Sequence, residues 1–214
     1  MINRVELKAK AKEFAFNNKW NIWKGILLCS IVSGAVSSVC EMLAGAVGGE
    51  EGNIISALII LIGGIAVMPL EIGLVDYFVK LVRKKDVDLT ESLFKYYKKE
   101  YLWNTLKIVI VANLIIFALS LLLVIPGIIW ALKYAMIYYL IVDKSAKDLE
   151  KDNLRKESES MMDGHKWEYV VLQLSFILWG LLVSVTCGIA AIWVVPYVTV
   201  TNVMWFDELK KLSK

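Results

Sequence analysis

The chain has 214 residues, of which 58% are hydrophobic and 21% are charged, and its mean hydropathy is +0.60. Soluble domains contain about 45–50% apolar residues, and this chain also has several long runs without charge. The composition therefore excludes a soluble globular protein and indicates an integral membrane protein. The net charge of +3 is less informative than the distribution of the charges along the chain.

Basic residues mark the segments that we expect on the cytoplasmic side. Almost all of the 24 Lys and Arg residues fall within residues 1–24, 80–101, 143–168 and 209–214. The other connecting segments hold no basic residue, and basic loops stay in the cytoplasm. The distribution predicts an all-α membrane bundle of six transmembrane helices over residues 24–208, with both termini inside and a basic tail at 209–214.

Residues 1–23 precede the first span and are predicted to form a cytoplasmic interfacial helix. Leu7, Ala11 and Phe14 recur at helical spacing, with lysines on the opposite side. This pattern is typical of an amphipathic helix that lies on an anionic inner leaflet, so we expect membrane lipids as partners. Trp20 then marks the interface, where tryptophan is enriched.

The apolar runs pair into three hairpins, with spans predicted at about 24–46, 54–81, 103–124, 127–142, 167–187 and 189–206. Each hairpin follows a polar helix and an aromatic interface, and this layout suggests a three-fold internal repeat. The alternative is that any in–out hairpin repeats basic, aromatic and apolar zones. Within the first span, Ser30, Gly34 and Ser38 form a ridge of small residues, which lets helices approach closely in lipid.

Two further cytoplasmic helices are expected, over residues 86–97 and 145–163. Asp88 and Glu91 have capping-box-like spacing at the start of the first. Ser145 is the predicted N-cap of the second. The second helix has a high charge density, so we expect it to stand in water.

The only histidine, His165, lies at the entrance to the last hairpin. With Asp163 and Glu168 nearby, it fits either a proton relay or a weak metal site. The favoured interpretation is a structural residue at a wet interface, because no second histidine and no nucleophile lie close in sequence. The full set of predicted interfacial residues is Trp20, Trp23, Trp103, His165 and Trp167.

Ionisable residues within the spans are the better candidates for a site, because such residues are costly in lipid and tend to face the bundle interior. With a rise of about 1.5 Å per residue, Glu41 and Lys133 fall near the outer interface. Glu71 and Lys107 fall in the inner third. We therefore hypothesise two depth-matched ion pairs, Glu41–Lys133 and Glu71–Lys107. The alternative is that each charge snorkels alone.

Lys133 shares a helix face with Trp130, Tyr134 and Tyr138. A cation on an aromatic face is able to line a polar cavity for an anionic or lipid ligand. The alternative is a lipid-facing aromatic belt with one buried pair. Three uncharged polar residues are expected to form interhelical hydrogen bonds rather than to bind a ligand: Asn113, Gln173 and Asn202.

Common catalytic motifs are absent from the sequence. It has no GxxxxGK[ST], HExxH, GxSxG or CxxC pattern, and its three cysteines have no metal-ligand spacing. We therefore expect no enzyme activity, no cofactor, no metal and no nucleic-acid partner.

The C-terminal half contains the motifs Gly164-His165-Lys166-Trp167, Leu174-Ser175-Phe176-Ile177, Trp179, Thr186, Gly188-Ile189, Trp193 and Pro196-Tyr197. With these motifs it resembles the "domain of unknown function 975" integral membrane proteins of Gram-positive bacteria. Ile125-Pro126-Gly127-Ile128-Ile129-Trp130, with Tyr134 and Met136, is similar to the family's middle hairpin. Leu178 departs from the pattern, which has glycine there. The N-terminal third matches in layout alone.

The resemblance implies a six-span protein of the bacterial plasma membrane and transfers no catalytic residue. The leading hypothesis is a non-enzymatic membrane protein that acts through lipids, another membrane protein or a second copy, in envelope homeostasis, export or peptide immunity. The alternative is a small-solute or lipid transporter or channel that uses a polar cavity around Lys133. An intramembrane enzyme is the weakest hypothesis.

Overall fold

The computed structural model describes residues 2–48, 53–85, 87–122, 124–151 and 153–213, and this part of the chain contains helices and no strand. The all-α prediction is therefore confirmed. In chain order the elements are α1 (Arg4–Gly48), α2 (Ile54–Val82), α3 (Leu89–Phe94), η1 (Lys95–Tyr97), α4 (Lys99–Leu122), α5 (Val124–Lys133), α6 (Ile137–Asp143), α7 (Ala146–Lys151), α8 (Leu154–Met162), α9 (Lys166–Leu174), α10 (Ile177–Val185) and α11 (Ala191–Leu212).

Four helical segments of the described chain are long and apolar enough to cross a membrane: Arg4–Val47, Ile54–Val82, Lys99–Leu121 and Lys166–Val185. They indicate a membrane protein. The predicted span 127–142 is instead split, since α5 ends at Lys133 and α6 begins at Ile137. In the last predicted span, the apolar part of α11 passes without a break into a charged end that contains Lys210 and Lys211.

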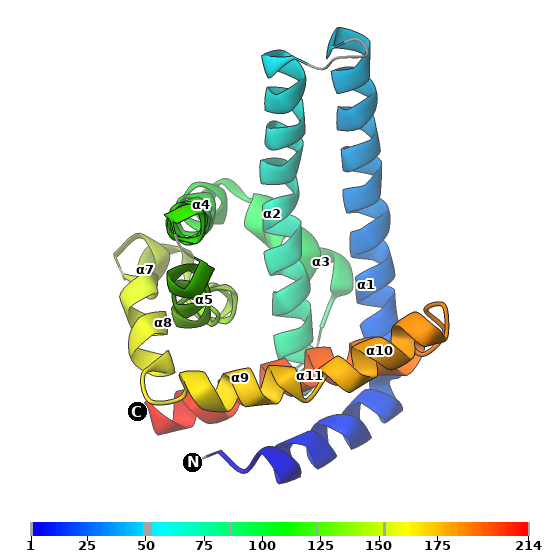
Figure 1. The fold of residues 1–214 in the computed structure, drawn as a ribbon, viewed down its shortest axis with the longest axis vertical. Coiled ribbons are helices and arrows are strands. Elements are labelled where there is room, and N and C mark those ends of the chain that lie inside the picture. The colour runs from blue at the N-terminus through cyan, green and yellow to red at the C-terminus, as the bar shows by residue number, and fades with distance from the viewer. Residues whose placement is uncertain (1, 49–52, 86, 123, 152, 214) are drawn as a thin grey trace.

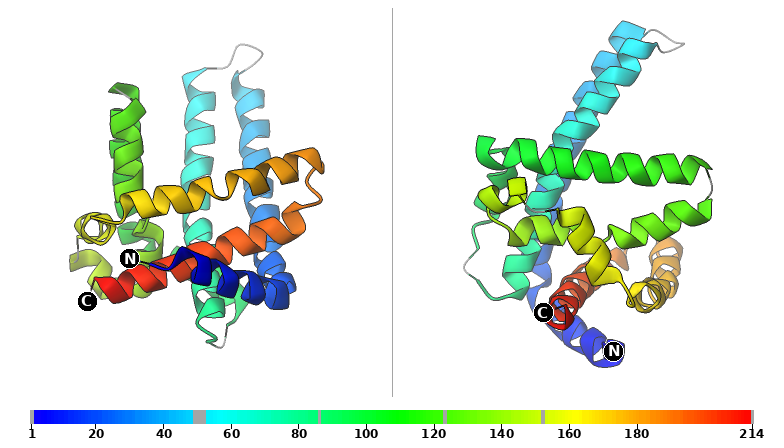
Figure 2. Two further views of the ribbon diagram at one scale, coloured as in Figure 1. Left: turned by 60° about the horizontal axis from the view of Figure 1, so that its bottom comes forward. Right: turned by 90° about the vertical axis from the view of Figure 1, so that its left-hand side faces the viewer.

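The helices pair into three hairpins that leave a common base. α1 packs on α2, α4 on α5, and α10 on α11. Figures 1 and 2 show that these hairpins project in different directions instead of lying parallel. The chain is therefore not a parallel six-helix bundle in this structure. Both termini lie at the base, where α11 ends beside the start of the chain (Figure 1).

The tightly packed core lies at this base, and the outer halves of the hairpins are exposed. Trp205, Phe206 and Tyr96 are among the largest fully buried side chains. In contrast, Ile31 and Met42 on the outer part of α1 are 67% and 69% exposed. Burial of apolar surface stabilises a fold in water, so the base has the packing of a soluble core while the hairpins present apolar surface outward.

The apolar face of the N-terminal helix contributes to the protein core. α1 is continuous from Arg4 through the first predicted span. Leu7, Ala11 and Ala15 are at most 5% exposed and belong to the protein core. Because α1 packs on α11, these residues contact the protein's own core. Phe14, the third residue of the predicted stripe, is partly buried, and contact of this helix with a lipid leaflet stays a prediction.

Two of the predicted helix starts are informative. Asp88 caps α3 by accepting a hydrogen bond from the Glu91 N–H at 3.0 Å, as its spacing predicted. The predicted helix 145–163 is two helices, α7 and α8. The reason lies in Asn153, whose side chain accepts from the Lys156 N–H at 3.4 Å and caps α8, because asparagine favours helix starts over helix interiors.

Candidate functional site at the base of the hairpins

Arg83 is the centre of an ion-pair cluster that joins the ends of α2, α6 and α11. It follows the last residue of α2. Its Nη1 and Nη2 lie 2.5 and 3.2 Å from the two carboxylate oxygens of Asp143, at the end of α6. Its Nε and Nη2 lie 3.1 and 2.5 Å from Asp207 Oδ1 on α11. Lys210 Nζ adds a contact of 2.6 Å to Asp143 Oδ2. We call these four residues the Arg83 cluster.

The Arg83 cluster is balanced in charge and partly buried. The Asp143 side chain is 7% exposed and that of Arg83 is 24% exposed. Burial by itself raises the pKa of Asp143, but the hydrogen bonds and charges of Arg83 and Lys210 outweigh it and hold that pKa below its ordinary value. Burial also opposes the charge on Arg83, and the two aspartates more than compensate, so the pKa of Arg83 is raised. Forked contacts of guanidinium with carboxylate fix geometry as well as charge.

A second charged cluster surrounds Asp76 on α2. Its side chain is 1% exposed and lies 2.5 Å from Lys80 Nζ and 3.3 Å from Lys95 Nζ. The Lys95 ammonium also lies over the rings of Tyr96 and Tyr101, at 5.2 and 5.3 Å from their centroids. These contacts tie α2 to η1 and to the start of α4.

The predicted ion pair between Glu41 and Lys133 is wrong. Lys133 pairs with Glu159 on α8, and its Nζ lies 4.2 Å from the centroid of the Trp130 ring. Ser158 Oγ donates to the Lys133 carbonyl at 2.7 Å. The prediction failed because it treated 127–142 as one straight descending helix. α5 instead ends at Lys133, beside the polar helix α8.

The predicted inner pair is also absent. Glu71 and Lys107 are exposed, as is Glu41, and none of the three forms an ion pair within the part of the chain that the structure describes. The structure therefore brings neither hypothesised pair together, and snorkelling of each charge stays a prediction.

The predicted aromatic face is present, and Lys133 is not among the residues that line the small cavity beside it. Tyr134 and Tyr138 line a cavity of about 50 Å³ together with Asn113 from α4. This space is close to that of one or two water molecules. Tyr134 packs edge-on against Trp130, with 5.4 Å between ring centroids. The charge of Lys133 is instead directed to Glu159.

Three of the predicted interfacial tryptophans have open surfaces. Trp20, Trp103 and Trp167 are 68%, 71% and 72% exposed. Trp23 instead donates from its indole N–H to the Ile192 carbonyl at 2.9 Å, which joins α1 to α11.

His165 has a local carboxylate partner. Its Nδ1 lies 3.1 Å from Glu168 Oε2, while Asp163 is engaged by Lys166 at 3.1 Å. His165 and Asp163 line a cavity of about 120 Å³ with Ser160 and the end of α11. The histidine therefore meets one carboxylate, that of Glu168, within hydrogen-bond distance in the described chain.

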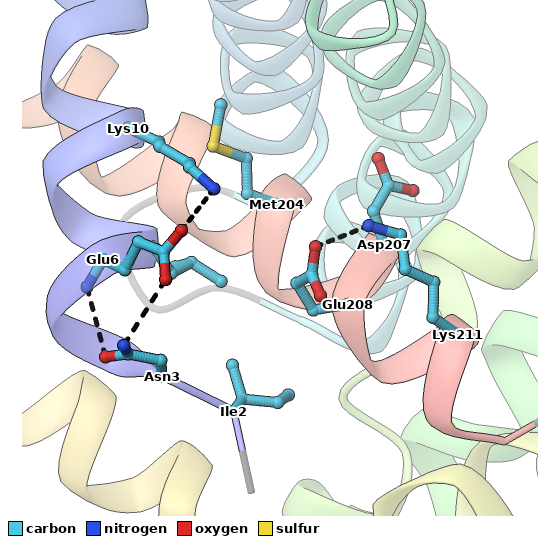
Figure 3. Close-up of a pocket in the computed structure, with 9 residues that line it drawn as sticks. Ile2, Asn3, Glu6, Lys10, Met204, Asp207, Glu208 and Lys211 are labelled. Carbon is cyan, nitrogen blue, oxygen red and sulfur yellow. Dashed lines mark hydrogen bonds and ion pairs between the residues drawn. The ribbon is translucent and has the colours of Figure 1, made fainter.

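A larger cleft lies between the start of α1 and the end of α11 (Figure 3). The cleft has a volume of about 300 Å³. Charged residues of α1 and α11 line it, together with Ile2, Leu7 and Met204. Glu6 pairs with Lys10, and Glu208 with Lys211, each at 2.6 Å. Asp207 lines the same cleft, so the cleft borders the Arg83 cluster. Each of these two ion pairs lies within its own helix, so Lys10 and Lys211 already have carboxylate partners.

Residues 104–213 match the family described as "Protein of unknown function (DUF975)". The chain belongs to this family. Neither the curated proteins nor the solved structures contain a match to the chain. The segment matched to DUF975 contains Asp143, Asp207 and Lys210 of the Arg83 cluster. Arg83 itself comes from the hairpin that precedes it.

Sequence reasoning missed the Arg83 cluster as a site. The charge distribution assigns Arg83 to a basic cytoplasmic segment, and no pattern in the sequence predicts a partner for Asp143 or Asp207. One signal was available, because each of the three residues directly follows or ends an apolar run. The interhelical role expected of Gln173 and Asn202 is confirmed, since Gln173 Nε2 donates to Asn202 Oδ1 at 2.8 Å.

Proposed function

We propose that this DUF975 protein is a non-enzymatic integral membrane scaffold that acts through lipids or through another membrane protein. In this proposal the three hairpins, which diverge in this structure, align in the bilayer and supply six membrane segments, with both termini and the ion-paired base on the cytoplasmic side of a bacterial plasma membrane. The roles considered above, in envelope homeostasis, export or peptide immunity, are different settings for such a scaffold.

The observation that carries the proposal is the division of the molecule into a charged base and apolar hairpins. The base holds the buried clusters around Arg83 and Asp76. The outer hairpin surface carries exposed apolar side chains such as Leu61, Phe117 and Val185. Surface of this kind is suited to lipid or to another membrane helix. Most basic residues of the sequence fall in the segments that lead into and out of the hairpins, as the positive-inside rule requires of the cytoplasmic side.

The transporter alternative is not supported by a specific contact. It needs a polar cavity around Lys133, whereas Lys133 is paired with Glu159 and the nearby cavity is about 50 Å³. Transport across vesicles is therefore the result that would favour this alternative over the scaffold.

The test is reconstitution of the purified full chain in phosphatidylcholine vesicles with and without anionic phosphatidylglycerol. We expect the anionic lipid to raise the thermal unfolding temperature, because cytoplasmic lysines gain counter-charges. We also expect the flux of small anions and cations to equal that of empty vesicles. Flux above that background which is lost in Lys133→Gln would replace the scaffold by the transporter. An unfolding temperature that is independent of lipid charge, together with no flux, would contradict a role through anionic lipid.

A further inference from the structure

Two cations of α1 converge on a groove against α9. The groove has a volume of about 250 Å³ and is lined by Arg4, Val5 and Lys8 of α1 and by Val171, Leu172 and Ser175 of the last hairpin. Its charged residues are both basic. Neither Arg4 nor Lys8 has a carboxylate partner within the described residues, although acids such as Glu6 lie close in sequence.

Lys8 is held in place by groups that leave its charge unneutralised. Its Nζ donates a hydrogen bond to Ser175 Oγ and lies 4.8 Å from the centroid of the Phe176 ring. A hydroxyl and an aromatic face orient an ammonium but carry no net negative charge. Because an ammonium has three N–H donors, Lys8 retains donors for an anion in the groove.

The groove lies where the predicted fifth span is interrupted. α9 ends at Leu174 and α10 begins at Ile177, and the hydroxyl of Ser175 donates to the Leu172 carbonyl. This break places a polar hydroxyl beside the apolar side chains of Val171 and Leu172. Arg4, one helical turn before Lys8, brings a guanidinium to the same groove. One side of the groove thus offers charged donors and the other offers apolar contacts.

We propose that this groove binds a phosphate group, recognised by Arg4 and Lys8, with Val5, Val171 and Leu172 contacting the carbon chain attached to it. Arginine and lysine are the usual partners of phosphate oxygens. The phosphate belongs either to the headgroup of an anionic lipid or to a soluble phosphate ester. The lipid source rests on the proposed function, whereas binding of a soluble ester does not.

The test measures binding of phosphatidylglycerol and of soluble glycerol phosphate to the full chain in a non-ionic detergent. Native mass spectrometry reports retained lipid, and isothermal titration reports the soluble ester. The test variant is the double substitution Arg4→Gln with Lys8→Gln. The matched control is Lys12→Gln with Lys85→Gln, which removes the same charge from two exposed positions outside the groove. Thermal unfolding checks that each variant is folded, and Arg4→Lys with Lys8→Arg keeps the charge.

We expect the test variant to lose about ten-fold in affinity for phosphatidylglycerol, because two charge-assisted contacts are removed. The control should change it less than about two-fold, and the charge-keeping variant should retain binding. Equal losses in the test and control variants would overturn the proposal, since they would show unspecific attraction to a basic protein. Specific binding of glycerol phosphate without retention of phosphatidylglycerol would support the phosphate site and reject lipid as its source, and so count against the proposed function.

If Arg4→Gln with Lys8→Gln fails to fold, Ser175→Ala provides the second variant. It removes the hydroxyl that orients Lys8 and leaves both cations, so we expect weaker phosphate binding than in the parent chain. Unchanged binding of both ligands in folded Ser175→Ala would then overturn the proposal.

Discussion

At the scale of single residues, the charges that matter most are those with buried partners. Asp143 is 7% exposed and contacts both Arg83 and Lys210, whereas Asp163 is 80% exposed and pairs with Lys166 alone. Removing one partner of a buried pair leaves the other charge uncompensated, which costs far more than loss of a surface pair. Asp143 and Asp163 therefore form a matched comparison of a buried and an exposed ion pair.

We predict that Asp143→Asn lowers the free energy of unfolding by roughly 3 kcal/mol, because Arg83 and Lys210 lose a shared buried counter-charge. Denaturant unfolding in detergent micelles, followed by tryptophan fluorescence, measures this change. Asp163→Asn is the control and should leave the free energy of unfolding nearly unchanged, because its ion pair is exposed to solvent. If the two variants were equally stable, the Arg83 cluster would not hold the base together.

The pH dependence of the Asp143 contribution follows from the sign of its pKa shift. The folded-state pKa lies below the ordinary value of 3.8, so the unfolded chain takes up the proton first as the pH falls. The stabilisation is fully present above about pH 4 and is lost as the pH falls through the folded pKa. We predict that the difference in unfolding temperature between the parent chain and Asp143→Asn is constant from pH 5 to 7 and narrows near pH 3. A difference that grows on acidification would contradict the assignment.

At the scale of elements, the contact between α2 and α3 depends on a glycine. A Cβ atom added to Gly73 would lie 2.2 Å from the Leu93 carbonyl oxygen, whereas one added to Gly64 on the same helix would meet nothing within 4 Å. The backbone of α3 can approach α2 this closely only where α2 has no side chain. The same residue type thus has a packing role at one position and none at the other.

We predict that Gly73→Ala destabilises the protein by about 2 kcal/mol, since the clash is with backbone and forces α3 to shift. Gly64→Ala should be neutral or slightly stabilising, because alanine favours the helix by about 1 kcal/mol over glycine. Thermal unfolding of both variants in the same detergent makes the comparison. Similar behaviour of the two would show that α3 does not pack on α2 at Gly73.

At the scale of the whole molecule, the three hairpins and their shared base define the topology to be tested. Cys187 is exposed in the turn between α10 and α11, and it adopts a positive φ of 49°. Cys29 and Cys40 lie within α1. In the proposed topology the Cys187 turn lies outside the cell, and the end of α11 lies inside.

We predict that a membrane-impermeant maleimide labels Cys187 in intact cells when Cys29 and Cys40 are replaced by serine. A chain that also has Cys187→Ser and carries Ser213→Cys should be labelled only after the cells are permeabilised, because the base remains in the cytoplasm. Labelling of the Ser213→Cys variant in intact cells would reverse the orientation, and no labelling of Cys187 under either condition would place its turn within the membrane.

The sequence by itself determined the class of the protein and much of its local structure. Long uncharged runs require helices in lipid, because backbone groups there must bond within the helix, and the all-α class follows. Short-range chemistry was equally readable, as in the Asp88 cap, where a side chain bonds three residues ahead. The likeness of the C-terminal half to DUF975 also needed no coordinates.

Only the tertiary structure decided which charges meet. The pair expected between Glu41 and Lys133 assumed a straight span, and a break after Lys133 brings that residue to Glu159 instead. Arg83 and Asp207 are 124 residues apart in the chain. Helical periodicity and motif spacing predict contacts only between residues that are close in sequence, so they did not predict this one. The same is true of Lys8 and Ser175, which are 167 residues apart. Local sequence favours helix and marks individual caps such as Asp88, but contacts between distant helices depend on their relative placement, which packing of the whole base determines.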